Sequence, residues 1–388
     1  MLQGSALLSG LSLAGCATPL GDTGPRGLGG VLPLFPIRAS ADRLFDVTVC
    51  LRPFRAMGPR LDTEQLGDTL VVHNYGHGGS GWSLSWGSST IAVQKAMSTS
   101  PREVAVLGCG ALGLTSAILA QNAGASVTIY AKDLLPDTRS ARATGSWTPD
   151  SRIALADKAG PGFAALWEQM ARTSFKTYRR YLGLPGNPVE WTDRYILYDI
   201  PPEEAAKHQP PDPLGFGQYE HLIGDLEPHR EILPPGSTPF PAPYVMQRET
   251  MMFNIADYGH TLMTDFLTAG GKFQRMEFHA PSDLQSLKEK VVINCPGYGA
   301  RALWKDESIT PVRGQIGWLV PQPEVNYALF YNGVSVLSRR DGIVVQDVSG
   351  GDIRGYNDAN ETPDRGEAER AVAIIAGLYS RFRLPTPA

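Results

Sequence analysis

The sequence predicts an α/β protein in which a parallel sheet is joined to a second region with an antiparallel sheet, of the α+β type. Two observations support this prediction. A strand, a glycine turn, a helix and a second strand follow one another near residue 100, and further buried-strand patterns recur towards the carboxyl end. A strand–helix–strand succession requires a crossover connection and therefore a parallel sheet. With 388 residues, the chain is long enough for two domains of ordinary size.

Hydrophobic patterns predict the individual elements in order. Strands are expected over residues 44–55, 69–75, 103–108, 126–133, 290–297, 314–320 and 342–348. Helices are expected over residues 88–97, 114–124, 163–182, 254–271 and 368–382. Residues 185–245 hold many prolines and aromatic residues, which is typical of a loop-rich region.

Composition excludes several classes of protein. Apolar residues make up 42% of the chain, charged residues 19%, and the net charge is −4, so we expect no nucleic-acid partner. The four cysteines have neither the CxxC nor the HxxxH spacing of a metal site. The sequence therefore predicts no zinc site, no other metal and no disulfide framework.

Residues 1–36 are expected to be a signal and tether segment. The uncharged run MLQGSALLSGLSLAGC ends at Cys16 in the manner of a bacterial lipoprotein signal, and it is too short to span a bilayer as a helix. This pattern predicts a lipid anchor at Cys16 and an exported protein, periplasmic or membrane-anchored. No Lys or Arg precedes the apolar run, which leaves open a start further upstream, or an unstructured terminus on a cytoplasmic protein.

The first chemical motif is a glycine-rich turn between a predicted strand and a predicted helix. It consists of Gly108, Cys109, Gly110, Ala111, Leu112 and Gly113. In a Rossmann-type fold such a turn lets a pyrophosphate approach the backbone at the helix amino terminus. Asp133 ends the next strand, where a carboxylate can accept a hydrogen bond from a ribose hydroxyl. The motif predicts dinucleotide binding without separating FAD from NAD; the alternative is a tight turn with no ligand.

A second glycine-rich stretch, HNYGHGGSG at residues 73–81, is more specific. Together with Arg52-Pro53-x-Arg55 it resembles the D-amino-acid oxidase family of FAD enzymes. The segments IYAKDLLPDTRSARATGSWTP (129–149), VVINCPGYGARAL (291–303) and PVRGQI (311–316) are also similar to that family. The resemblance touches most of residues 44–382 and is weak over 150–290.

The resemblance implies a Rossmann-type FAD-binding domain over residues 37–150 and 285–320. The substrate domain would then comprise mainly residues 151–284 and 321–388. In the family the dinucleotide-binding unit comes first and the HNYGHGG block closes the chain, whereas here the block precedes the unit. The exchanged order predicts a circular permutation, which is plausible where chain termini lie close together.

The resemblance also implies roles for particular residues. Backbone N–H groups of Gly78, Gly79, Ser80, Gly81, Trp82 and Ser83 would line the flavin, where negative charge develops. The ribose and adenine side would be bound by Lys132 and Asp133. The pyrophosphate and flavin would be bound by Thr138, Arg139, Ser140, Thr144, Gly145 and Ser146. His73 and His77 are expected to be structural, hydrogen-bonded imidazoles.

Arg52, not Arg55, would hold the substrate carboxylate in a bidentate pair so that the α-hydrogen faces flavin N5. The alternative is a surface ion pair. The family has two tyrosines after the RGQI turn, and only Tyr331 is available here, as a displaced substitute. Arg339 and Arg340 would recognise an acidic side chain or form a solvated turn.

The sequence thus predicts an FAD oxidase of an amino acid or amine, with a D-amino acid expected and O2 reduced to H2O2. The alternatives are a dehydrogenase that passes electrons to another acceptor and a non-catalytic flavin-binding lipoprotein.

Overall fold

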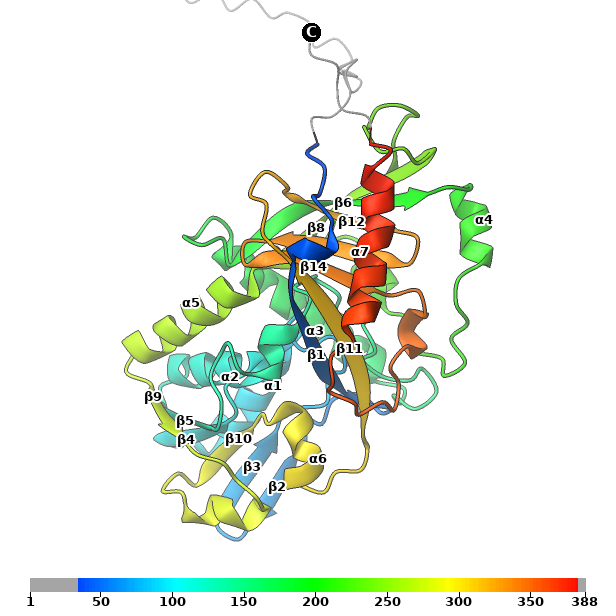
Figure 1. Cartoon of the computed structure of the whole chain (residues 1–388). Helices are drawn as coiled ribbons and strands as arrows, with labels where there is room; N and C mark the ends of the chain where they lie inside the picture. Colours follow the sequence, from blue (N-terminus) through cyan, green and yellow to red (C-terminus); the bar gives the residue numbers. More distant parts are fainter. Residues whose placement is uncertain (1–33, 383–388) are drawn as a thin grey trace, which may run out of the picture.

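Two sheets organise the computed structural model, which describes residues 34–382 (Figure 1). The first sheet has six strands in the order β2 (Thr63–Leu66), β3 (Thr69–His73), β10 (Val291–Asn294), β4 (Glu103–Leu107), β5 (Ser126–Ala131) and β9 (Lys272–Arg275). The strands from β3 to β9 are parallel, and β2 alone runs antiparallel to its neighbour. The predicted parallel sheet is therefore confirmed.

The second sheet has eight strands. Their order is β1 (Leu44–Arg55), β11 (Ile309–Leu319), β14 (Gly342–Asp347), β13 (Val334–Arg339), β12 (Tyr327–Tyr331), β6 (Val189–Tyr198), β8 (Tyr244–Phe253) and β7 (Glu231–Ile232). Every pairing is antiparallel except that of β12 with β6. The mixed α/β class, with an antiparallel second region, is as the sequence predicts.

Helices cover the sheets and bury the main core. Helix α1 (Ser85–Ala96) packs against α2 (Ala111–Asn122) and α3 (Phe163–Tyr178), and α5 (Ile255–Thr268) packs against α2. Their buried side chains join those of β4, β5 and β10 in one apolar cluster. Helix α6 (Ala300–Leu303) contributes Leu303 to a smaller cluster that includes Tyr130 of β5, and α7 (Arg365–Tyr379) packs on the eight-stranded sheet. The short helix α4 (Pro202–Lys207) buries no residue.

Two long strands connect the sheets and differ from the predicted domain boundaries. We expected β1 and β11 in the FAD-binding domain, but they belong to the eight-stranded sheet and run from it towards the six-stranded one (Figure 1). The reason is their mutual pairing, which extends from Leu44 to Arg55. Conversely, β9 and α5, which we expected in the substrate domain, pack with the six-stranded sheet.

The elements formed by the HNYGHGG block precede β4 in the chain, as predicted, yet they pair with later strands: β1 pairs with β11, and β3 pairs with β10. The carbonyl of Phe35 and the hydroxyl of Tyr379 both hydrogen-bond to the Tyr327 hydroxyl, at 2.7 and 2.6 Å. The circular permutation itself stays a prediction. Cys16 and the signal segment up to residue 33 lie outside the described residues. Within residues 34–382, no helix combines the length and apolarity needed to cross a membrane.

Candidate functional site

A cavity of about 450 Å³ lies where the two sheets meet, and most of the residues predicted as a site line it. The six-stranded sheet provides the turn after β4 and the end of β5, while β1 and β11 provide the opposite wall. The predicted residues in the lining are Arg52, Gly78, Gly79, Gly81, Trp82, Gly108, Cys109, Gly110, Ala111, Leu112, Lys132, Asp133, Thr138, Arg139, Ser140 and Thr144. The fold therefore brings together two glycine-rich loops and the R-P-x-R segment.

The turn after β4 has the geometry that the GxGxxG motif predicts. Gly108 has φ +90°, a conformation that favours glycine, and a Cβ there would collide with the carbonyl of Cys295. A Cβ on Gly110 would lie 2.6 Å from Ser140 Oγ at the cavity wall. Gly113 lies outside the cavity lining. A Cβ there would collide with the Gly108 carbonyl, so glycine lets α2 pack closely against the turn. Gly108 and Gly113 therefore need glycine because a Cβ at either position would collide with backbone, whereas at Gly110 only the Ser140 hydroxyl would have to move.

The second glycine-rich loop differs in detail from the prediction. The N–H groups of Gly78, Gly79 and Ser80 already donate to the carbonyls of Pro53, Ser151 and His77, each at 2.9 Å. Within the described residues, no hydrogen bond uses the N–H of Gly81 or Trp82, which also line the cavity. The predicted donors Gly78, Gly79 and Ser80 are thus already used within the protein, whereas Gly81 and Trp82 keep free N–H groups.

Ser80 and Ser83 also lie outside the lining. The Ser80 hydroxyl donates to the Ser151 carbonyl at 3.1 Å, and Ser83 Oγ accepts the Thr148 N–H at 2.9 Å. Both side chains are buried and fix the adjacent loop rather than face the cavity.

Arg52 reaches the cavity from β1. Its guanidinium lies directly over Gly314 of β11, where any Cβ would collide with it. In the described part of the chain, this guanidinium has neither an ion-pair partner nor a hydrogen-bond partner. Burial lowers the pKa of Arg52, although Cys50 and Asp352 act in the opposite direction; an arginine nevertheless stays charged in proteins. The cavity thus contains an uncompensated cation.

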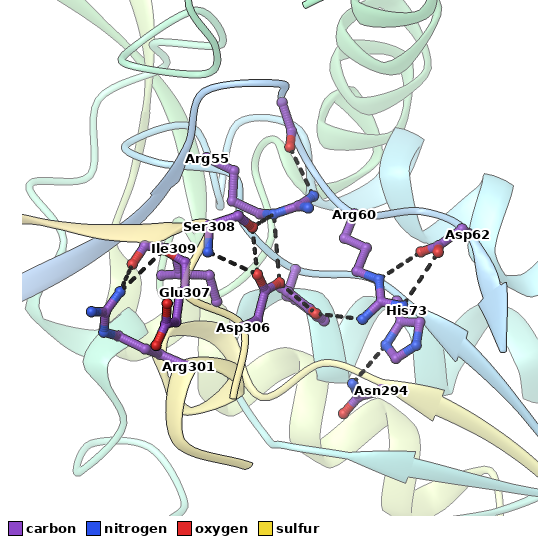
Figure 2. A network of polar contacts seen from close by, with 12 residues as sticks. Arg55, Arg60, Asp62, His73, Asn294, Arg301, Asp306, Glu307, Ser308 and Ile309 are labelled. Carbon is purple, nitrogen blue, oxygen red and sulfur yellow. Dashed lines mark hydrogen bonds and ion pairs between the residues drawn. The ribbon is translucent and has the colours of Figure 1, made fainter. Parts of the chain in front are cut away.

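Arg55 is absent from the cavity lining and belongs instead to a polar network (Figure 2). Its Nε donates to Ser308 Oγ at 2.8 Å, and the side chain lies 3.7 Å from Asp306. Asp306 also accepts the Tyr75 hydroxyl at 2.9 Å, and Tyr75 in turn accepts Arg60 Nη1 at 3.0 Å. This network supports the predicted distinction between Arg52 and Arg55.

The two loop histidines differ. His73 is buried, and its ring nitrogens contact Glu64 at 3.0 Å and Asn294 at 2.9 Å, so the structural interpretation is confirmed. His77 lines the cavity; its Nε2 lies 2.7 Å from Ser88 Oγ, but its buried Nδ1 has no partner among the described residues. For His77 the structural interpretation is therefore incomplete.

Charged residues follow the rest of the cavity. Lys132 pairs with Glu277 at 3.3 Å, and Arg139 pairs with Glu361 at 2.6 Å while lying 5.3 Å over the Tyr298 ring. Arg142, which was not among the predicted residues, lines the same cavity and donates to the Val49 carbonyl at 3.2 Å. The other lining residues that were not predicted include Cys50, Tyr130, Met276, Phe278, His279, Pro296, Gly297, Tyr298, Gly314 and Ile316. Tyr130, Pro296, Gly297, Tyr298, Gly314 and Ile316 lie within segments that resemble the family, whereas Cys50, Met276, Phe278 and His279 lie outside the segments that the sequence comparison used.

Three further predicted residues are not brought into the cavity. The Gly145 carbonyl accepts the Phe253 N–H at 2.7 Å, and Ser146 bridges to β8. Tyr331 is buried in the cluster beneath α7, where its hydroxyl donates to Asp199 at 2.8 Å and accepts Arg381 Nη2 at 3.0 Å. Tyr331 therefore does not substitute for the missing tyrosines, because β12 orients it towards α7.

Comparison with known proteins agrees with this geometry. The DAO family, described as FAD dependent oxidoreductase, matches residues 103–386, from the first residue of β4 onward. The chain therefore belongs to this family of FAD-dependent oxidoreductases. The match leaves Arg52 and the HNYGHGG loop outside it.

Individual relatives are distant. A D-amino-acid oxidase from Streptomyces coelicolor is 28% identical over 55% of this chain and 58% of its own length. One from Dictyostelium discoideum is 27% identical over 71% of this chain and 73% of its own length. The matched region thus spans less than two thirds of the Streptomyces relative. The crystal structure of glycine oxidase from Geobacillus kaustophilus is 14% identical, with a TM-score of 0.45, over 73% of this chain and 78% of that one.

The residues present fit FAD, the cofactor of the family. Gly108 and Gly110 line the cavity at the start of α2, where the N–H groups of the helix amino terminus favour an anion such as a pyrophosphate. The buried Thr138 Oγ1 has no protein partner in the described structure, and neither does His77 Nδ1. Buried polar atoms of this kind are costly unless a ligand or water satisfies them.

Proposed function

We propose that this protein is an FAD-dependent oxidase that acts on an amino acid, with D-amino acids as the substrate class. The observation that carries the proposal is the Arg52 guanidinium, which lines the cavity and has no hydrogen-bond or ion-pair partner within residues 34–382. A guanidinium can bind a carboxylate through two parallel hydrogen bonds, which fixes both position and orientation. The names of the Streptomyces and Dictyostelium relatives support the D-amino-acid class.

The cofactor is held by residues from both sheets. The turn from Gly108 to Leu112 would receive the pyrophosphate, and Arg139 and Arg142 add positive charge along the same wall. The free N–H groups of Gly81 and Trp82 would stabilise negative charge on the ring system. When bound, FAD supplies an acceptor for the two electrons and the hydrogen that leave the substrate Cα.

The protein contributes orientation rather than an acid–base pair at the substrate end. Of the described lining residues, the carboxylates Asp133 and Glu277 follow β5 and β9, away from β1. His77, which bridges to Phe54 in the same strand as Arg52, also lines the cavity, and burial lowers its pKa to about 3, so it stays neutral. Arg52 therefore acts by holding the carboxylate while the substrate amine loses its proton before binding.

The test is anaerobic addition of single D- and L-amino acids to the purified yellow protein. We expect D-amino acids to bleach the flavin band near roughly 450 nm, and Arg52→Ala to raise the required concentration by about 100-fold. Failure of every amino acid to bleach the wild type would refute the proposal and favour a non-catalytic flavin protein.

The electron acceptor is tested by admitting air to the bleached protein. We propose O2 as the acceptor, so one H2O2 is expected for each substrate molecule oxidised. A flavin that stays bleached in air, but recovers with a quinone, would identify a dehydrogenase instead.

A further inference from the structure

The protonation state of His77 can be derived from its neighbours. Asn74 directs its Nδ2 at Ser89 Oγ and Ser116 Oγ, both at 3.2 Å, which leaves its Oδ1 as an acceptor. Ser88 fills that acceptor by donating its hydroxyl proton at 2.6 Å. The single proton of Ser88 is then used, so at 2.7 Å from His77 Nε2 its oxygen must accept.

It follows that His77 carries its proton on Nε2. A neutral imidazole with Nε2–H has an unprotonated Nδ1, which is a hydrogen-bond acceptor. The ring is 1% exposed, and burial lowers its pKa to about 3, so Nδ1 does not take up a proton at ordinary pH. This buried acceptor has no partner among the described residues, although nearly all buried polar atoms have one.

The position of His77 indicates what would satisfy it. The residue lines the cavity and bridges to Phe54 of β1, while the Gly78 N–H donates to the Pro53 carbonyl at 2.9 Å. His77 therefore lies beside the segment that carries Arg52. A cation for a carboxylate and a neutral acceptor for an N–H group match the two functional groups of an amino acid.

We propose that His77 Nδ1 is a binding residue that accepts a hydrogen bond from an N–H donor in the cavity, with the Asn74–Ser88 relay holding it as an acceptor. The donor has two possible sources, the amine of the substrate or a ring N–H of the cofactor. The substrate arm rests on the proposed function, whereas the cofactor arm needs only FAD binding.

Two variants separate the acceptor from the relay. His77→Gln can preserve the contact with Ser88 but removes the acceptor at the Nδ1 position. His77→Asn places its amide oxygen near the Nδ1 position and loses the contact with Ser88. The control is His73→Gln, because both ring nitrogens of His73 are used by Glu64 and Asn294 outside the cavity.

The substrate arm compares the KM of D-alanine with the inhibition constant of propionate, which lacks the amine. If the amine is the donor, His77→Gln raises the KM about five- to tenfold, the cost of one hydrogen bond. The propionate constant then changes less than twofold, and His77→Asn and His73→Gln stay near the wild type. The cofactor arm measures FAD affinity of the apoprotein by flavin fluorescence, where a similar weakening in His77→Gln identifies the ring N–H as the donor.

The proposal is overturned if His77→Gln changes neither the KM of D-alanine nor the FAD affinity. It is also overturned if His77→Gln raises the inhibition constant of propionate as much as the KM of D-alanine while the FAD affinity stays unchanged. An independent readout is the ¹⁵N NMR spectrum of the histidine-labelled wild-type holoprotein. We expect a His77 signal of the Nε2–H tautomer, assigned by its loss in His77→Asn. A protonated Nδ1 would overturn the proposal, and its assignment needs only one folded variant at position 77. If no amino acid is oxidised, the proposed function fails, but the tautomer and the FAD affinities still decide the role of His77.

Discussion

The contact between Gly314 and Arg52 leads to a sharp prediction about carboxylate binding. A Cβ at position 314 would lie far inside contact distance of the Arg52 guanidinium, and ordinary contact begins only at 3.4 Å. The guanidinium must therefore move by about 1 Å in Gly314→Ala, because the glycine backbone is fixed by its pairing with Cys50. A displacement of about 1 Å can cost roughly 100-fold where two groups must align.

The expected effect is a rise of about 10- to 100-fold in the KM for a D-amino acid. This range corresponds to the loss of about 1.5–3 kcal/mol, the contribution of a hydrogen bond to a charged group. The inhibition constant of propionate should rise by the same factor, because propionate shares only the carboxylate. Thermal stability should change little, since alanine is tolerated in a strand and Gly314 has no positive φ.

A double-mutant cycle tests the assigned cause. In an Arg52→Ala background, Gly314→Ala should have almost no further effect, because the atoms it displaces are absent. Gly162→Ala is the control, since a Cβ at Gly162 has no heavy atom within 4 Å. If Gly314→Ala weakens propionate equally with and without Arg52, the cation over Gly314 is not the carboxylate site.

Three further outcomes follow from the contacts. Arg55→Gln should lower the free energy of unfolding by about 3 kcal/mol in urea titrations, because it leaves Asp306 poorly compensated, with little change in KM. His77 has a pKa of about 3 when folded and an ordinary value of 6.5 when unfolded, so only the unfolded chain gains its proton as the pH falls. Between pH 7 and pH 5 this group should therefore cost about 2 kcal/mol of stability, a loss that His77→Gln lacks in urea titrations at both pH values. Tyr331→Phe should leave KM unchanged in steady-state assays, because its hydroxyl contacts Asp199 and Arg381; a tenfold rise would place it at the substrate after all.

The sequence predicted the unit around the GxGxxG turn to within a few residues because its signals are local. A β-branched run forms β4, a glycine with positive φ makes the turn, and Gly124 stops α2 with φ +94°. The same holds for α3, whose amphipathic pattern was predicted over 163–182 and is observed from Phe163 to Tyr178.

Strands β6 and β8 were missed because their stability is not local. Both lie at the borders of the stretch that was predicted to be loop-rich, and they pair with each other from Val189–Phe253 to Tyr198–Tyr244. Exposed and buried positions do not alternate regularly along β6, where Trp191 is 41% exposed. The segment VEWTDRYILY is rich in β-branched and aromatic residues, but without a regular period-2 pattern the prolines around it favoured a loop.

The position of the Arg339 side chain also depends on contacts between residues that are far apart in the sequence. The sequence left it either as a recognition residue for an acidic group or as part of a solvated turn, and the structure supports neither. It is buried over the Trp318 ring, pairs with Asp341, and donates to the Ala143 carbonyl at 2.8 Å. Ala143 lies 196 residues away in the sequence, so only the folded chain reveals that Arg339 supports the cavity wall.

The position of the cavity explains why motifs scattered along the chain form one site. The turn after β4 belongs to the six-stranded sheet, whereas Arg52 and Gly314 belong to the eight-stranded one, and the HNYGHGG loop connects β3 to α1 between them. The site therefore depends on two sets of contacts, the pairing of β1 with β11 and the neighbouring positions of β3, β10 and β4. Neither set depends on which block comes first in the chain. A chain in which the HNYGHGG block precedes the dinucleotide-binding unit can thus form the same cavity between the two sheets, provided that the connection from α1 to β4 is long enough. Here that connection is a short 3-10 turn over Met97–Thr99 followed by Ser100 in the left-handed region, and it delivers the chain directly into the central strand of the cofactor site.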